Sequence, residues 1–141
     1  MIEKFSTAVW KGTLKEGAGT LNSQSGTIAN LPYTFATRFE GGKGSNPEEL
    51  IGAAHAGCYA MFLSALMSGE GITPESIEAR STIGLDPTTE GGPTVKTAHL
   101  VVKVKAPAAE AKVRELAEKA KAGCPISKLL KAEVTMEVSV G

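Results

Sequence analysis

Hydrophobic and polar residues alternate over much of the first forty residues, which predicts extended structure. The alternation is clear between residues 5 and 11, and glycines and an Asn-Leu-Pro turn interrupt the segments that follow. This pattern predicts a meander of three or more antiparallel strands between residues 3 and 40. Residues 33–39 alternate again and are predicted to form its last strand, with Arg38 on the face opposite to Phe35 and Phe39.

A long apolar segment follows, and it predicts one helix from Pro47 to about Met67. Asn46 is suited to cap this helix, and Glu48 and Glu49 suit the positive end of its dipole. A helix that is apolar on nearly all sides must be buried on all sides, which is difficult for a chain of this size alone. The sequence therefore predicts an obligate homodimer, in which a second subunit covers part of the helix.

The second half of the chain alternates between strand and helix patterns. Strands are expected at residues 76–85 and 94–104, a helix at 108–122, a short helical turn at 124–131 and a closing strand at 134–140. The order of strands, helix, strands, helix and strand indicates an α+β fold. There is no repeat or linker, so a single domain over residues 1–141 is expected.

Composition narrows the function classes. Lys+Arg and Asp+Glu are both 15 in 141 residues, so no basic excess favours nucleic acid. The N-terminus lacks the apolar core of a signal peptide, and the apolar segment contains His55 and glycines, so we expect a cytoplasmic protein with no membrane partner. Two cysteines with His55 and His99 match no common zinc spacing, and no phosphate-binding motif occurs, so neither metal nor cofactor is expected.

The two cysteines are either inert core thiols or redox-active ones. Cys58 lies in the middle of the long helix, where a small core residue is the more frequent role. Gly57 costs that helix about 1 kcal/mol relative to alanine, which would be explained if something approaches the backbone beside the thiol. Cys124 precedes Pro125 at a helix start, where it is either a half-buried cap residue or a thiol whose thiolate the helix end favours.

Four other residues have two interpretations each. Arg38 is either a solvated residue or one that holds a thiolate, and Glu48 either interacts with the helix dipole or fixes Arg38 by a two-point ion pair. Glu49 suits either task equally. His55 lies one turn before Cys58 and could deprotonate it, although a structural hydrogen bond is more frequent. Ten helical residues span about 15 Å, so Glu48 and Cys58 share a site only if the helix breaks or a partner supplies Glu48.

Two separated segments resemble the OsmC branch of the OsmC/Ohr peroxidase family. They are TRFEGGKGSNPEELIGAAHAGC at residues 37–58 and AKAGCPISKLLKAEV at residues 120–134, and each contains one cysteine. The likeness spans essentially the whole chain, with Gly57 standing where alanine is expected. The resemblance implies an α+β, OsmC-like intertwined homodimer, with antiparallel sheets wrapped around a long buried central helix and two sites at the subunit interface.

The same resemblance implies a chemistry. Cys58 corresponds to the peroxidatic cysteine and Cys124 to the resolving one, Arg38 to the arginine that activates the thiolate, and Glu48 to the acid that positions Arg38. The implied enzyme is a stress-defence peroxidase that reduces organic hydroperoxides, and more weakly hydrogen peroxide, through a Cys58 sulfenic acid and a Cys58–Cys124 disulfide. For the reductant, the family suggests a dithiol of the lipoyl type.

Apolar residues near Cys58 predict a substrate with an apolar end, unless they are simply core. They are Tyr59, Met61, Phe62 and Leu66. One alternative function is a thiol–disulfide oxidoreductase acting on proteins, which would favour a Cys-x-x-Cys motif, whereas these cysteines are 66 positions apart. Another is a non-enzymatic dimeric stress protein that binds an apolar ligand at its interface and consumes no peroxide.

Overall fold

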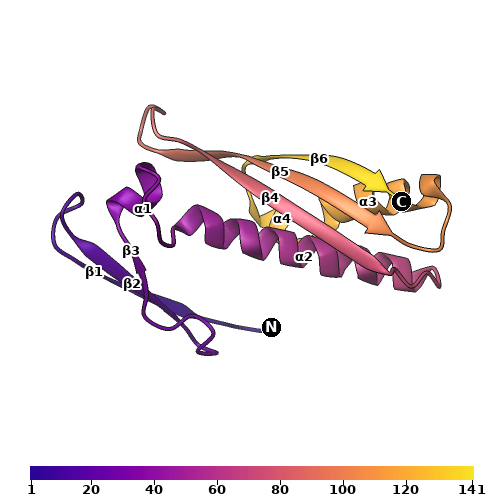
Figure 1. Ribbon diagram of the computed structural model, residues 1–141, viewed down its shortest axis with the longest axis horizontal. Helices are drawn as coiled ribbons and strands as arrows, with labels where there is room; N and C mark the ends of the chain where they lie inside the picture. The colour runs from indigo at the N-terminus through magenta and orange to yellow at the C-terminus, as the bar shows by residue number, and fades with distance from the viewer. The chain divides into compact units, whose positions relative to one another are not determined.

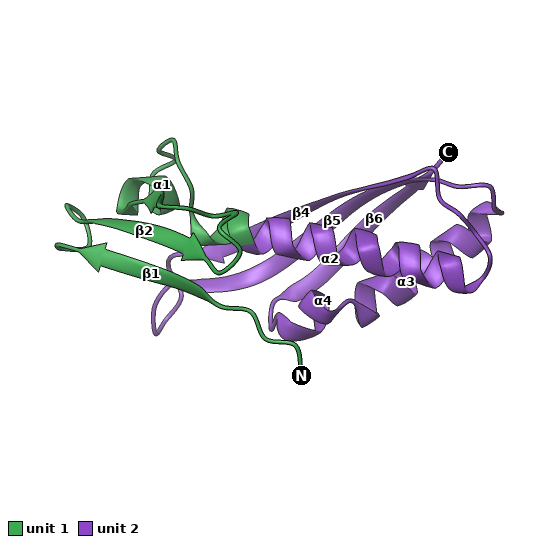
Figure 2. Ribbon diagram, turned by 90° about the horizontal axis from the view of Figure 1, so that it is seen from below, with its two compact units in different colours: residues 1–50 green, residues 51–141 purple.

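The computed structural model describes all 141 residues and divides into two compact units, residues 1–50 and 51–141 (Figure 2). Unit 1 contains the strands β1 (Ser6–Lys11), β2 (Ala18–Ser23) and β3 (Leu31–Tyr33), followed by the short helix α1 (Phe35–Phe39). The three strands pair antiparallel in the order β1-β2-β3, which confirms the predicted meander. A single domain over residues 1–141 remains a prediction.

Residues 35–39 are helical, so the prediction of a strand at 33–39 was wrong beyond Tyr33. Thr34 caps the helix: its Oγ1 accepts the N–H of Thr37 at 3.2 Å, and the Thr37 hydroxyl accepts the N–H of Thr34 at 2.9 Å. This reciprocal pair satisfies backbone donors that a helix start leaves free. Phe35 and Phe39 lie one helical turn apart and stack with ring centroids at 4.9 Å, a spacing that also fits alternation along a strand.

Helix α2 (Pro47–Gly69) is continuous, as expected (Figure 1). Its predicted cap is confirmed, since the Asn46 Oδ1 accepts the N–H of Glu49 at 2.8 Å. The expectation that it is buried on all sides is not met within one chain, where α2 is buried along one face only. The buried residues are Gly52, His55, Tyr59, Leu63 and Met67. The opposite face is exposed and carries Ala53, Ala54, Gly57, Met61 and Ala65.

Unit 2 contains β4 (Ser76–Asp86), β5 (Thr94–Lys105), α3 (Glu110–Gly123), α4 (Pro125–Leu129) and β6 (Glu133–Val140). The sheet order is β4-β5-β6, with β4 and β5 antiparallel. β5 and β6 pair in parallel, so the prediction of purely antiparallel sheets was wrong here. The reason is the connection: α3 and α4 carry the chain back before β6 starts, and such a crossover makes neighbouring strands parallel.

The core of unit 2 lies between the sheet and the helices α2 and α3 (Figure 1). Alternate residues of β5 point into it, and α2 and α3 contribute their apolar stripes. The fully buried members include Leu63, Met67, Leu100, Val102, Val113 and Ala117. By length and composition alone α2 could cross a membrane, but in this fold its apolar face forms part of this core.

Candidate active site

The two thiols lie together. The Cys124 Sγ is 3.0 Å from the Cys58 Sγ, and neither sulfur is in a disulfide. Cys58 belongs to the middle of α2, whereas Cys124 lies at the junction of α3 and α4, 66 residues later. A disulfide has an S–S distance of about 2.05 Å, so the pair closes with a movement of about 1 Å.

Cys124 occupies a fixed position. It ends α3 and begins α4, as predicted: its N–H donates to Ala120 O at 2.9 Å and its carbonyl accepts from the N–H of Lys128 at 3.0 Å. Of the two interpretations of Cys124, that of a half-buried cap residue does not hold, because the residue is fully buried in the core. Cys58 remains half-buried. Cys58 is therefore the thiol that a reagent reaches, and Cys124 is the thiol behind it.

Burial raises the pKa of the Cys58 thiol above its ordinary value, and the S–H of Cys124, which points at it, raises the pKa further. The backbone N–H of Ile126, in the first turn of α4, acts in the opposite direction by donating to the Cys58 sulfur. The first two causes outweigh the third. A reactive thiolate at Cys58 therefore needs a positive charge from elsewhere.

Arg38 and Glu48 form a two-point ion pair within unit 1. The Arg38 Nε donates to Glu48 Oε1 at 2.8 Å, and Nη2 donates to Oε2 at 3.2 Å. Such a fork fixes the plane of the guanidinium as well as its position. The Glu48 side chain is only 12% exposed, and Glu49, which suited this task equally by sequence, is exposed. The structure thus distinguishes two neighbouring acids that the sequence could not.

Arg38 is one of the residues that line a small, open aromatic pocket of about 260 Å³ in unit 1. Its lining consists of Trp10, Leu14, Tyr33, Thr34, Phe35, Arg38 and Phe39. Gly19 of β2 pairs with Trp10 on one side and Tyr33 on the other, and a Cβ there would clash with the Tyr33 ring. Sequence reasoning missed this pocket, because its signal is a glycine between two aromatic residues of neighbouring strands.

His55 makes two structural hydrogen bonds, the role that the sequence favoured. Its Nδ1 lies 2.7 Å from Ser81 Oγ of β4, and its Nε2 lies 2.8 Å from Ser127 Oγ of α4. The imidazole is fully buried, and burial lowers the pKa of His55 below 6.5, so the ring is neutral at neutral pH. Sequence reasoning missed both serines, which lie 26 and 72 residues away.

The four apolar residues expected beside Cys58 have different surroundings. Tyr59 is a core residue whose hydroxyl donates to Ala117 O at 3.1 Å. Phe62 and Leu66 pack on the core together with Cys58. Met61 is 76% exposed on the other face of α2. The simple core interpretation therefore holds for Tyr59.

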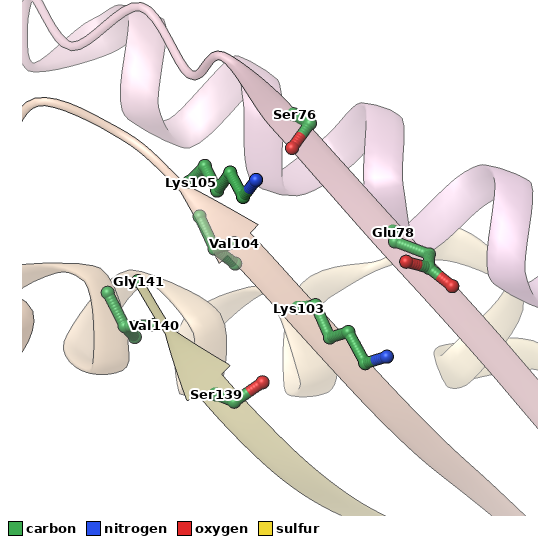
Figure 3. A pocket seen from close by; sticks show the side chains of 8 residues that line it. All are labelled: Ser76, Glu78, Lys103, Val104, Lys105, Ser139, Val140 and Gly141. Atoms are coloured by element: carbon green, nitrogen blue, oxygen red, sulfur yellow. The ribbon is translucent and has the colours of Figure 1, made fainter.

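An open hollow of about 500 Å³ lies at one end of the β4-β5-β6 sheet (Figure 3). Lys103, Lys105 and Glu78 border it with Ser76 and Ser139, and neither cysteine is among its lining residues. No three metal-ligating side chains cluster anywhere in the chain. The candidate reactive groups are the thiol pair of unit 2 and the arginine–glutamate pair of unit 1.

The profile of the family described as "OsmC-like protein" matches residues 40–139, a stretch that includes Glu48 and both cysteines. The chain belongs to the OsmC-like family. It is 46% identical over 137 residues to Peroxiredoxin OsmC of Escherichia coli strain K12, an alignment that covers 96% of this chain and 95% of that protein. It is also 30% identical over 140 residues to the uncharacterized protein YmaD of Bacillus subtilis, covering 95% and 90%.

Solved structures show that the OsmC-like fold extends over the whole chain. The organic hydroperoxide resistance protein OhrB of Bacillus subtilis superposes with a TM-score of 0.72 at 23% identity, covering 97% of this chain and 98% of that one. An OsmC-like protein of Mycoplasma pneumoniae gives a TM-score of 0.76 at 17% identity, covering 99% and 97%. The fold is thus shared with proteins whose sequences have diverged widely.

Proposed function

We propose that the chain is a cysteine-based peroxidase that reduces organic hydroperoxides to alcohols, with Cys58 as the attacking thiol and Cys124 as the resolving thiol. The observation that carries this proposal is the 3.0 Å separation of the two sulfurs in a chain homologous to a peroxiredoxin. The half-buried sulfur faces the substrate and the buried one stands behind it. The expected role is resistance to hydroperoxides during oxidative or osmotic stress.

The first step requires the Cys58 thiolate, whose formation the local surroundings oppose. We propose that the guanidinium of Arg38 supplies the missing charge, and that Glu48 orients it while leaving N–H groups free for substrate. The thiolate sulfur attacks the distal peroxide oxygen, the O–O bond breaks, and the leaving alkoxide takes up a proton as alcohol. Cys58 becomes a sulfenic acid.

The second step closes the disulfide. The Cys124 sulfur attacks the Cys58 sulfenic acid, an S–S bond forms, and the hydroxyl leaves with a proton as water. An external dithiol, for which the lipoyl class is the proposed source, then reduces the disulfide by thiol exchange. Both cysteines return to thiols, and the dithiol leaves as its own disulfide. No metal or cofactor takes part in this scheme.

The proposed enzyme is a homodimer, and two observations support it. The exposed face of α2 is made of alanines with Gly57 and Met61, so a second copy of the chain can approach the helix closely. In unit 1, only Gly19 is buried, and such a layer lacks a core of its own. Because α2 is unbroken between Glu48 and Cys58, we propose that the partner subunit's Arg38 and the partner subunit's Glu48 complete each site.

The aromatic pocket beside Arg38 supports an apolar substrate. Five of its seven lining side chains are aromatic or aliphatic, and its volume of about 260 Å³ suits a small hydrocarbon group. Transfer of such a group from water to the pocket favours binding by roughly 25 cal/mol per Å² buried. Hydrogen peroxide has no group of this kind, so we expect alkyl and aryl hydroperoxides to react faster. The proposed compartment is the cytoplasm.

Mass spectrometry of the reduced protein after one equivalent of cumene hydroperoxide tests this function. Wild type is expected to lose two hydrogens and to give one peptide pair joined through Cys58 and Cys124. Cys124→Ser should stop at a sulfenic acid on Cys58, which dimedone traps, and Cys58→Ser should stay unmodified. Unmodified thiols in wild type would refute the peroxidase.

The alternative is a non-enzymatic dimeric stress protein that binds apolar ligands. The pocket beside Arg38 is the observation in its favour. This alternative predicts that Cys58→Ser binds cumyl alcohol, an unreactive analogue, while wild type leaves cumene hydroperoxide intact. Consumption of the hydroperoxide by wild type, with loss in Cys58→Ser, would exclude it.

A further inference from the structure

Three residue pairs join α2 to the α3–α4 junction in an antiparallel register. Phe62 contacts Gly123, Cys58 contacts Cys124, and His55 contacts Ser127. On α2, His55 lies three residues before Cys58 and Phe62 lies four residues after it, so all three face the same side of that helix. The two thiols thus form the middle of three contacts.

The outer contact at Gly123 depends on the absence of a side chain. A Cβ at Gly123 would lie 2.9 Å from the ring of Phe62, closer than such atoms approach. Glycine therefore allows the end of α3 to reach α2 just before Cys124. This contact sets the approach of the junction from one side.

The other outer contact is a buried hydrogen bond. His55 is fully buried, Ser127 is 9% exposed, and their Nε2 and Oγ atoms lie 2.8 Å apart. The second ring nitrogen of His55 is bonded to Ser81 on β4, so the imidazole connects the sheet to α4. No buried side-chain donor or acceptor is left without a partner, and breaking the bond at Ser127 would leave one.

We propose that His55 and Ser127 are positioning residues for the disulfide step, an inference that rests on the proposed peroxidase function. Their hydrogen bond holds α4 on α2, and thereby holds Cys124 beside Cys58 while the sulfenic acid exists. Ile126, whose backbone N–H opposes the rise in the pKa of Cys58, lies between Cys124 and Ser127.

Two reactions compete for the Cys58 sulfenic acid. Attack by the Cys124 sulfur gives the disulfide and water. Attack by the sulfenate on a second hydroperoxide transfers one oxygen to the sulfur and gives a sulfinic acid and an alcohol. The sulfinic acid is not reduced by dithiols. Loosening of α4 slows the first reaction more than the second, because only the first needs Cys124 in place. The disulfide-to-sulfinate ratio therefore reports the position of Cys124.

Ser127→Ala and Ser81→Ala form a matched pair for the experiment. Each substitution removes a serine hydroxyl that is hydrogen-bonded to one ring nitrogen of His55, but only Ser127 belongs to α4. With excess cumene hydroperoxide, Ser127→Ala is expected to give a disulfide-to-sulfinate ratio roughly tenfold below wild type. Ser81→Ala should stay near the wild-type ratio, and Ser127→Thr, which keeps the hydroxyl, should restore it. Equal ratios in Ser127→Ala and Ser81→Ala would overturn the inference.

A second measurement needs no peroxide. Equilibration of each protein with glutathione redox buffers gives the effective concentration of one thiol for the other. We expect Ser127→Ala to lower it roughly tenfold and Ser81→Ala to leave it near wild type. An unchanged value in Ser127→Ala would overturn the positioning role even if wild type consumes hydroperoxide. Failure of wild type to consume hydroperoxide would instead refute the function on which the inference rests.

Discussion

At the scale of single residues, the contrast between Glu48 and Glu49 shows how one helical step decides a role. Both acids lie in the first turn of α2, but Glu48 meets the Arg38 guanidinium at two atoms and is largely shielded, whereas Glu49 is exposed. Exposed charge pairs contribute little, because water screens them and the side chains lose entropy. The shielded, two-point pair is the one that fixes a guanidinium.

This contrast yields a prediction about reactivity. Glu48→Gln should weaken the hold on Arg38 and slow the alkylation of Cys58 and its reaction with hydroperoxide roughly tenfold, because a loosely held guanidinium stabilises the thiolate less. Glu49→Gln removes the same charge one residue away and should react like wild type. Stopped-flow kinetics with stoichiometric hydroperoxide measure both. Equal slowing in the two variants would mean that only the local net charge matters.

A second prediction concerns the buried neutral His55. Burial lowers the pKa of its imidazole in the folded protein below 6.5, so as pH falls through 6.5 the unfolded chain binds a proton that the folded protein does not. The contribution of His55 to the free energy of unfolding should therefore be complete above pH 6.5. It should decrease as the pH falls from 6.5 to the lowered pKa of His55 in the folded protein. Urea unfolding of the reduced protein at pH 7.5 and 5.5 measures this decrease.

His55→Gln should flatten that pH dependence, although it also lowers stability at pH 7.5. Protein concentration must be the same in all samples, because the stability of a dimer depends on it. A wild-type slope retained in His55→Gln would assign the pH dependence to other groups.

At the scale of elements, two glycines of α2 illustrate opposite demands on one helix. A Cβ at Gly52 would lie 3.0 Å from the backbone oxygen of Ser81, so α2 and β4 approach closely only because this side chain is absent. At Gly57 a Cβ would meet nothing within 4 Å in the same chain. The first glycine sets the packing of the helix on the sheet, whereas the second has no such contact within one chain and lies on the face proposed for the second copy.

Substitution by alanine should therefore have opposite effects at the two positions. Gly52→Ala should lower the free energy of unfolding by about 1–3 kcal/mol, because the backbone of β4 must shift. Gly57→Ala should leave it unchanged or raise it by up to about 1 kcal/mol through helix propensity. Chemical denaturation measures both variants. A loss in Gly57→Ala as large as in Gly52→Ala would mean that the second copy leaves no room for a methyl group at Gly57.

Much of the element order could be predicted because caps and periodicity are local signals. Asn46 and Pro47 predicted the start of α2, and the alternation of hydrophobic and polar residues predicted β4, β5 and β6. Residues 35–39 were wrongly predicted to form a strand, because aromatic residues four apart satisfy both a strand face and a helix face. The parallel pairing of β6 with β5 could not be predicted either, since alternation gives the face of a strand but not the direction of its neighbour.

The candidate site could be predicted less completely. Local pattern gave both cysteines, Arg38 and either Glu48 or Glu49 as candidates, but the pairing of the cysteines and the choice of Glu48 came from family resemblance rather than from spacing. Contacts over 66 residues depend on how helices and sheet pack, which no local window contains. Ser81 and Ser127 were missed for the same reason, because nothing near either serine indicates a distant imidazole.

At the scale of the whole molecule, the exposed face of α2 gives a test of assembly. Ala65→Glu places a charge on this face, and we expect it to lower the dimer affinity at least tenfold and to reduce peroxidase activity with it. Ala111→Glu makes the same change at an exposed alanine of α3 and should leave both properties near wild type. Sedimentation velocity over a dilution series measures the assembly. A stable dimer in Ala65→Glu would place the interface elsewhere.

The long separation of Cys58 and Cys124 along the chain makes oxidation a covalent ring closure. The ring encloses β4, β5 and α3, most of unit 2, and a cross-link of this span lowers the entropy of the unfolded ensemble by the equivalent of about 4 kcal/mol. The oxidised protein should therefore melt at a higher temperature than the reduced one. Thermal melts with and without dithiothreitol measure the difference. Each turnover would thus pass through a disulfide form that is more stable than the dithiol form. The protein should therefore resist heat and proteases best in the interval before its reductant restores the thiols.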